Sequence, residues 1–277
     1  MHHSSLQHSK GRSKHLKKWQ KITIIGILIV ALFAVLTGCN QTETSSTSTE
    51  GEITKIVVGT EATYRPFEWR DEQGNIVGFD IDLINAIGEE LGIEVEIRNI
   101  PFDSLIQSLQ NGNIDVIASA MTITERRQET VDFSKPYYES VQAIVVKADS
   151  DIASAEDLLD KKVGVQNGTT GSEVAAQLLG ERNQNISRFD TIANAFNSQL
   201  VGQVEAVIAD KPVAERFIAN NPNSGLKVIV DDSFESEYFG LAVRKTSPEL
   251  LAKINEALEK LEQEGKIAEF LDTHMGS

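Results

Sequence analysis

The stretch IDVIASAMTITERR, residues 114–127, decides the expected fold. Its first four residues predict a short buried strand, because most of them are apolar and β-branched. The small and hydroxyl residues that follow predict a turn, and Thr124 is typical of the residue that caps a helix, here over TERRQ. A strand, a small-residue turn and a helix start leave backbone N–H groups unpaired and directed at one place.

Two side chains of this stretch are further hydrogen-bonding candidates beside those N–H groups. Arg127 lies one turn inside the expected helix, where its planar guanidinium can bind a carboxylate through two parallel hydrogen bonds. Thr122 supplies a hydroxyl. The stretch therefore indicates a site for one carboxylate group. An ordinary strand–helix connection with a surface arginine is the alternative.

The first 38 residues have the pattern of a secretory signal peptide. Six basic residues precede an apolar run of about fourteen residues at 22–35, which is shorter than a membrane span. The sequence LTGC at 36–39 resembles a bacterial lipobox, in which Cys39 is lipidated and becomes the mature N-terminus. We therefore expect a lipoprotein anchored at the extracellular face of the cell membrane. One uncleaved membrane anchor is the alternative.

Cysteine usage and charge exclude several classes of protein. Cys39 is the only cysteine, so neither a disulfide nor a thiol nucleophile is expected deeper in the chain. Removal of residues 1–38 takes away six basic residues and no acidic one, so the net charge of −15 becomes −21. This acidity argues against binding nucleic acid or anionic lipid. Residues 39–51, rich in Ser and Thr, are expected to form a disordered tether.

From residue 53 onward, apolar periodicity predicts alternating strands and helices. In the first half the expected strands are residues 55–59, 93–97, 114–117 and 142–147, and the expected helices are 80–91 and 102–110. The aromatic segment 60–69 has neither period and is expected to be a loop. The order β-α-β-α-β predicts a parallel sheet with helices on both faces.

The pattern restarts after residue 147. The expected strands are residues 162–165, 205–209, 226–230 and 238–243, and the expected helices are 155–159, 172–179, 192–200, 212–219, the segment from Pro248, and 267–274. Two α/β halves of similar rhythm predict two lobes rather than one extended sheet.

Six motifs of the chain resemble those of a known family. They are TYRPFE at 63–68, GFDIDL at 78–83, the stretch at 114–127, DFSKPY at 132–137, VGVQNGTTG at 163–171 and VIAD at 207–210. Their order and spacing are similar to those of bacterial extracellular solute-binding proteins of the polar amino acid family, which feed ABC importers. The resemblance covers the chain from residue 53 to its end.

The resemblance implies an α/β fold of the type II periplasmic-binding-protein kind. Such proteins have two lobes, each a mostly parallel sheet flanked by helices, and two crossing strands between them that let the lobes close on a ligand. Lobe 1 would comprise residues 52–140 and 237–277, and lobe 2 residues 141–236. An ABC importer permease is the implied partner, and the binding protein itself is expected to be a monomer.

The resemblance also implies a carboxylate end of the binding site. Arg127 and Thr122 would bind the carboxylate of an α-amino acid, together with Thr169 and Thr170, whose turn opens a helix in the other lobe. A plain strand–helix turn is the alternative for residues 168–171.

The ammonium group would be bound by Asp210, although an Asp after a buried strand is also typical of a cap for the next helix. Ser119 matches a family position that contacts the amine through main chain or side chain. Ala120 follows it where some relatives have Ser, so a second hydroxyl is missing there.

The side chain of the ligand is expected between the rings of Tyr64 and Phe102, which favour a flat or cationic group. Phe102 alone is also typical of a core residue. Glu61 matches a position where binders of basic amino acids often carry an acid, and a solubilising surface Glu is the alternative. Gln166 matches a position that contacts the tip of the side chain and is lysine in some glutamine-specific relatives. A neutral Gln166 and an anionic Glu61 favour arginine or another basic amino acid, with glutamine as the alternative.

An enzyme and a sensor domain are the rival functions. Four of the five histidines precede residue 16 and the fifth, His274, is almost terminal, so the mature domain lacks a plausible His base or His metal site. A dehydratase that uses only carboxylates remains the enzymatic alternative, because a few relatives of this fold act on cyclic dienyl acids. Asp80 and Asp82 are a candidate metal pair, but the start of a helix explains both. No cofactor and no metal is expected. The absence of a later apolar run of membrane length argues against a sensor.

Overall fold

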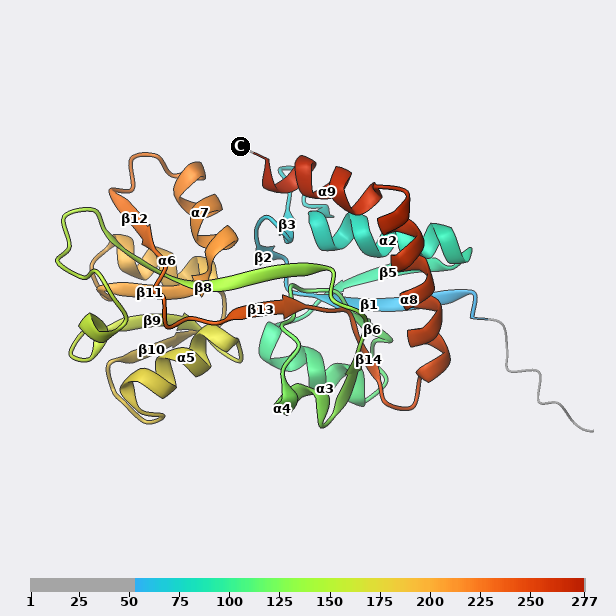
Figure 1. Ribbon diagram of the computed structural model, residues 1–277, viewed down its shortest axis with the longest axis horizontal. Helices are drawn as coiled ribbons and strands as arrows, with labels where there is room; N and C mark the ends of the chain where they lie inside the picture. The colour runs from blue at the N-terminus through green and yellow to red at the C-terminus, as the bar shows by residue number, and fades with distance from the viewer. Residues whose placement is uncertain (1–52, 277) are drawn as a thin grey trace, which may run out of the picture. The chain divides into compact units, whose positions relative to one another are not determined.

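Two β-sheets organise residues 53–276, the part of the chain that this computed structural model describes (Figure 1). The expected signal peptide, the lipidation site Cys39 and the expected tether lie outside the described residues. The order of strands in the first sheet is β5 (Glu94–Asn99), β1 (Lys55–Thr60), β6 (Val116–Ile117), β14 (Ala242–Arg244) and β7 (Val131–Phe133).

The second sheet follows the order β10 (Ile186–Phe189), β9 (Val163–Gln166), β11 (Ala206–Asp210), β8 (Tyr138–Lys147) and β12 (Leu226–Ile229), with β13 (Ser236–Phe239) also paired to β8. In each sheet, three strands pair parallel: β5, β1 and β6 in the first, and β10, β9 and β11 in the second. The remaining pairs are antiparallel, because β8 and β14 run against their neighbours. The expected α/β class is confirmed.

Helices cover both faces of each sheet. They are α2 (Phe79–Leu91), α3 (Leu105–Gln110), α4 (Glu125–Gln128), α5 (Thr170–Leu179), α6 (Ile192–Leu200), α7 (Lys211–Asn220), α8 (Pro248–Gln263) and α9 (Lys266–Met275), with 3-10 helices at Phe102–Ser104 and Glu156–Leu158. Within residues 53–276, none of them combines the length and the apolar character that crossing a membrane requires.

The first sheet is buried on both faces, as the strand periodicity requires. Val116 belongs to the same apolar cluster as Ile84 of α2 and Ile254 of α8. Its neighbour Ile117 belongs to a different cluster, with Leu109 of α3. Figure 1 shows α2 and α3 on opposite sides of this sheet. The second sheet alternates in the same way, with α5 on one face and α6 and α7 on the other.

The ten-residue strand β8 and the four-residue strand β13, which are antiparallel to each other, run between the two sheets. The first four residues of β8, Tyr138–Val141, pair with β13, and its later residues pair with β11 and β12. Figure 1 shows β8 and β13 running side by side between the two halves of the described chain. The predicted lobe boundaries at 140/141 and 236/237 fall within these strands and remain a prediction.

Three local expectations differ from the structure. Residues 60–69, expected to be a loop, contain β2 (Thr63–Tyr64) and β3 (Glu68–Arg70), which form a small sheet with β4 (Ile76–Val77). The strand expected at 238–243 is divided into β13 and β14, which belong to different sheets, because Gly240 and Leu241 carry the chain from one to the other. The helix expected at 155–159 is a single 3-10 turn, in which Asp157 accepts a hydrogen bond from the Ser154 N–H (2.9 Å).

Candidate functional site

A small cavity lies between the turn that follows β6 of the first sheet and the ends of β9 and β11 of the second sheet. It measures about 10 Å³, and nine of the eleven predicted site residues line it: Tyr64, Phe102, Ala120, Thr122, Arg127, Gln166, Thr169, Thr170 and Asp210. Residues more than 100 positions apart in the sequence therefore meet at one place. The other two predicted residues lie next to it: Glu61 contacts the lining residue Gln166, and Ser119 contacts Glu61.

Arg127 comes from α4, the short helix that Thr124 was expected to cap. The Thr124 hydroxyl accepts a hydrogen bond from the Arg127 N–H (3.2 Å), so this cap is confirmed. The guanidinium is buried, at 4% exposure for the whole residue, and donates to the carbonyls of Thr122 (2.7 Å) and Gly168 (3.0 Å). Burial lowers the pKa of Arg127. The alternative of a surface arginine is therefore wrong.

Asp210 ends β11 and points into the cavity rather than at the next helix. Its side chain makes no capping bond to α7, so the capping alternative is wrong. One carboxylate oxygen accepts from Tyr64 Oη (2.5 Å), and the other from Ser140 Oγ (2.8 Å) and Gln142 Nε2 (3.2 Å). Burial raises the pKa of Asp210 to about 7, and the neighbouring Glu237 carboxylate adds to the rise.

Glu61 and Gln166 meet at another side of the cavity. Glu61 is 4% exposed, and its Oε2 accepts from Thr63 Oγ1 (2.9 Å) and from Gln166 Nε2 (3.2 Å). A role for Glu61 as a solubilising surface acid is therefore wrong. Burial raises the pKa of Glu61. Among the described residues, Gln166 Oε1 has no hydrogen-bond partner. This side of the cavity thus carries acceptors in excess of donors.

Two buried acidic side chains accept hydrogen bonds from the turn that follows β6. The Ser119 hydroxyl accepts from the Glu61 N–H (3.0 Å) and donates to Glu68 (2.9 Å), so it faces away from the cavity. Ala120 has a left-handed backbone, with φ +43°, and its N–H donates to Asp80 (2.7 Å). Asp80, at the start of α2, therefore fixes this turn, which agrees with its structural interpretation. Within residues 53–276, no group of three or more acidic, His or Cys side chains is placed to hold a metal ion.

Thr169 and Phe102 also line the cavity. Thr169 caps α5: its hydroxyl accepts from the Ser172 N–H (3.2 Å) and donates to the Gln166 carbonyl (2.8 Å). The Phe102 ring lies 5.6 Å from the Arg127 guanidinium, measured from ring centroid to Cζ, and Phe102 also packs against the apolar cluster that contains Leu109 of α3. Both roles considered for Phe102 are thus compatible with its position.

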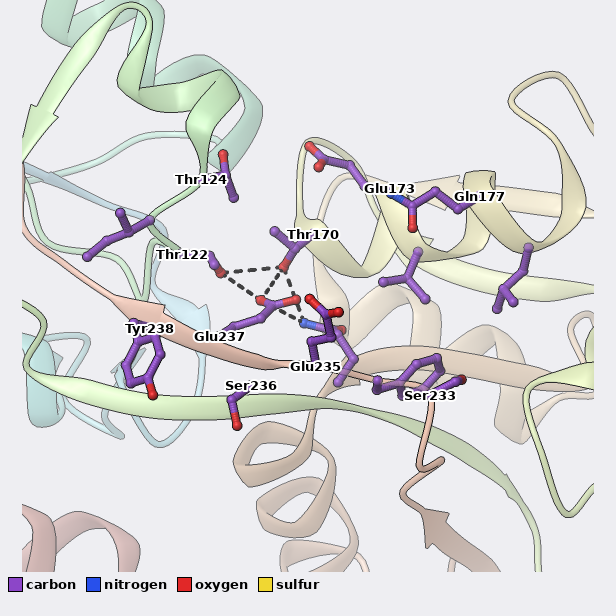
Figure 2. A pocket seen from close by; sticks show the side chains of 15 residues that line it. Thr122, Thr124, Thr170, Glu173, Gln177, Ser233, Glu235, Ser236, Glu237 and Tyr238 are labelled. Carbon is purple, nitrogen blue, oxygen red and sulfur yellow. Dashed lines mark hydrogen bonds between the residues drawn. The ribbon is translucent and has the colours of Figure 1, made fainter.

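Glu237 is a functional candidate that the sequence did not indicate. It lies on β13, opposite Ser140 of β8, and its Oε2 accepts from Thr122 Oγ1 (2.9 Å), Thr170 Oγ1 (2.7 Å) and Gln142 Nε2 (3.4 Å). Figure 2 shows these hydrogen bonds from the side of a neighbouring groove. The sequence around it gives no distinguishing signal, because Glu237 follows Glu235 and Ser236 in a polar segment, and alternating polar residues are typical of any strand with one solvent face.

Comparison with known proteins identifies the family. Residues 56–277 match the family described as bacterial extracellular solute-binding proteins, family 3. The chain belongs to this family. The resemblance stated from its motifs is thereby confirmed.

Two relatives of this solute-binding protein are similar over most of their lengths. The probable histidine-binding protein of Neisseria gonorrhoeae is 36% identical, over 76% of this chain and 78% of its own. The arginine-binding extracellular protein ArtP of Bacillus subtilis is 34% identical, over 91% of this chain and 95% of its own.

A solved structure confirms the fold of the solute-binding protein. The arginine-, lysine-, histidine-binding protein ArtJ of Geobacillus stearothermophilus has a TM-score of 0.78 and 44% identity, over 81% of this chain and 96% of its own. The two-lobed α/β architecture expected from the motifs is therefore correct. These relatives are binding proteins by description.

Proposed function

We propose that this protein binds a basic amino acid, arginine first, between its two lobes and delivers it to an ABC importer. The buried pair of Glu61 and Gln166 is the observation that carries the choice of ligand. Glu61 supplies a carboxylate and Gln166 an unpartnered carbonyl oxygen, and a guanidinium offers five N–H donors to such acceptors. The amide of glutamine offers two donors and no charge, so it matches this end less well.

The charged residues at the other end of the cavity match the carboxylate and the ammonium group of an α-amino acid. In our proposal Arg127 binds the α-carboxylate and Asp210 the α-ammonium group, which the burial of both side chains beside the cavity supports. The carboxylate of Asp210 and the guanidinium of Arg127 line the cavity, and the carboxylates of Glu61 and Glu237 contact residues that line it. A ligand with two positive groups and one negative group balances these charges better than a neutral zwitterion does.

Binding requires the lobes to part. A cavity of about 10 Å³ holds about one water molecule, far less than an amino acid. Hydrogen bonds that cross between the lobes include Tyr64 to Asp210, Arg127 to the Gly168 carbonyl and Gln166 to Glu61. In our proposal the ligand replaces these bonds with its own, which couples binding to closure of the lobes.

Glutamine is the second candidate ligand, and a dehydratase-like enzyme is a less favoured third. The family relatives described above are binding proteins, which supports binding without turnover. We also propose that Cys39 is lipidated after removal of residues 1–38, so that a monomeric protein stays attached to the outer face of the membrane.

Calorimetric titration with arginine, lysine, histidine and glutamine tests the proposed ligand. We expect arginine to bind most tightly, because its planar guanidinium can form forked hydrogen bonds and stack on rings. Incubation with arogenate or prephenate tests the enzymatic alternative, and turnover of either compound would replace the binding proposal.

A further inference from the structure

A groove of about 580 Å³ lies on the far side of the two cavity threonines. Thr122 and Thr170 line both the cavity and this groove, so they form part of the wall between them. Glu237 also lines the groove and lies against the wall, as Figure 2 shows. Its position follows from the backbone, because the Thr122 residue forms a β-bridge with Phe239, two residues beyond Glu237.

One carboxylate oxygen of Glu237 accepts hydrogen bonds from both threonine hydroxyls. Its Oε2 lies 2.9 Å from Thr122 Oγ1 and 2.7 Å from Thr170 Oγ1, and the two hydroxyl oxygens are 3.4 Å apart. A hydroxyl has a single proton to donate, and a carboxylate oxygen only accepts. While both protons point at Glu237, neither threonine hydroxyl can donate into the cavity.

The ligand needs those same protons. Under the proposed function, on which this inference rests, the α-carboxylate of the amino acid lies beside Arg127 and the two threonines. We infer that Glu237 competes with the α-carboxylate of the ligand for the hydroxyl protons of Thr122 and Thr170, and thereby sets the affinity of the site. Glu237 is thus a positioning residue that acts through the threonines and does not touch the ligand.

A purely structural role for Glu237 predicts the opposite change in ligand affinity when its carboxylate is removed. Thr122 and Thr170 belong to different lobes, so the Glu237 carboxylate also links the lobes in the closed arrangement. If that link were its main contribution, its removal would open the protein and weaken binding. The direction of the change in affinity therefore separates the two roles.

The test compares Glu237→Ala with wild type by calorimetric titration. Because a hydrogen bond to a charged group is released for the ligand, we expect arginine to bind about tenfold more tightly to the variant. Argininamide, which has a neutral carboxamide in place of the α-carboxylate, should gain less than arginine does, since its carbonyl oxygen is a weaker acceptor for these protons than a carboxylate. Glu235→Ala is the matched control, because Glu235 is exposed and lines the same groove, and it should leave both affinities within about twofold.

A double-mutant cycle excludes a simple effect of charge. In the Thr170→Val background, the gain in binding free energy from Glu237→Ala should fall to about half, because one of the two contested protons is gone. A gain that survives unchanged, an equal gain for argininamide, or weaker binding of arginine to Glu237→Ala would each overturn the inference. Should Glu237→Ala fail to fold, Glu237→Gln keeps the size of the side chain and is expected to tighten arginine about threefold.

Failure of the proposed function has a different outcome. If neither wild type nor Glu237→Ala binds any amino acid, the proposed function is wrong and the inference falls with it. If wild type binds arginine and Glu237→Ala binds it no more tightly, only the inference is overturned.

Discussion

Glu61 is the residue on which the choice between arginine and glutamine depends. Its carboxylate is buried beside Gln166, and only a cationic ligand needs that charge. Glu61→Gln should therefore weaken arginine by roughly 1–3 kcal/mol, while glutamine changes little. Calorimetry with both amino acids measures this, with Glu72→Gln, an exposed site, as the control. Tight binding of glutamine by wild type, with no binding of arginine, would show that the pocket recognises an amide.

We expect Asp210 to make ligand binding sensitive to pH near neutrality. Its pKa is raised from 3.8 to about 7, so below pH 7 the carboxyl is mostly protonated. An ammonium ligand favours the ionised form, and below pH 7 binding must release this proton. We expect the affinity for arginine to fall as pH decreases, by up to about tenfold per pH unit below pH 7, and to level off above pH 8. Burial raises the pKa of Glu61 as well, which acts in the same direction.

Titrations in buffers of different ionisation enthalpy count the released proton. Asp210→Asn should bind more weakly and lose most of this pH dependence. An affinity for arginine that stays constant between pH 5 and pH 8 in wild type would show that Asp210 is ionised before the ligand arrives.

At the scale of elements, Gly78 fixes the start of α2. Its φ is +135°, and a Cβ added there would lie 2.1 Å from the Phe67 carbonyl oxygen. Gly78→Ala should lower the free energy of unfolding by roughly 2–4 kcal/mol, because both backbone strain and a main-chain clash oppose it. Gly74 also has a positive φ, of +86°, but a Cβ there meets nothing within 4 Å.

Gly74→Ala is therefore the matched control for strain without a clash. It should cost about 1 kcal/mol, as measured by urea unfolding. Equal losses in the two variants would mean that the contact with Phe67 does not constrain the start of α2.

Local patterns predicted most of the elements, because each rests on neighbouring residues. The cap at Thr124 and the end of α2 at Gly92, which has a left-handed backbone, follow from side chains within one turn. The division of 238–243 into β13 and β14 does not, since it depends on two sheets that only the tertiary fold brings together.

Prediction of the site was limited in the same way, because some of its contacts exist only in the tertiary fold. Its predicted residues came from motif resemblance, and the structure brings nine of them to one cavity. Glu237 was missed because its importance depends on Ser140 of a paired strand and on threonines more than 60 positions away. Likewise, only the fold shows that Asp210 turns into the cavity and does not cap α7.

At the scale of the whole molecule, we expect attachment to the membrane to depend on Cys39. Wild type expressed with its signal peptide should partition into the detergent phase, because lipid would be added at this cysteine. Cys39→Ala should become soluble or remain as an uncleaved precursor. Detergent partitioning and labelling with radioactive palmitate measure both outcomes. Lipid labelling that is unchanged in Cys39→Ala would defeat the proposed anchor.

In the proposed function, the two lobes close on the charged groups of an amino acid. Arg127 and its neighbour Arg126 provide a matched pair of tests, because Arg127 is buried in the cavity wall whereas Arg126 forms a surface ion pair with Glu173. The Arg126–Glu173 pair lies on the surface but joins residues of the two predicted lobes. Surface pairs contribute about 0–1 kcal/mol, so Arg126→Ala should weaken arginine binding by no more than about 1 kcal/mol.

Titration of wild type, Arg127→Ala and Arg126→Ala with arginine is the most direct measurement. We expect Arg127→Ala to lose at least roughly 2–4 kcal/mol of binding free energy, since the ligand carboxylate would be left desolvated without its partner. Binding of arginine to Arg127→Ala at wild-type strength would contradict the account.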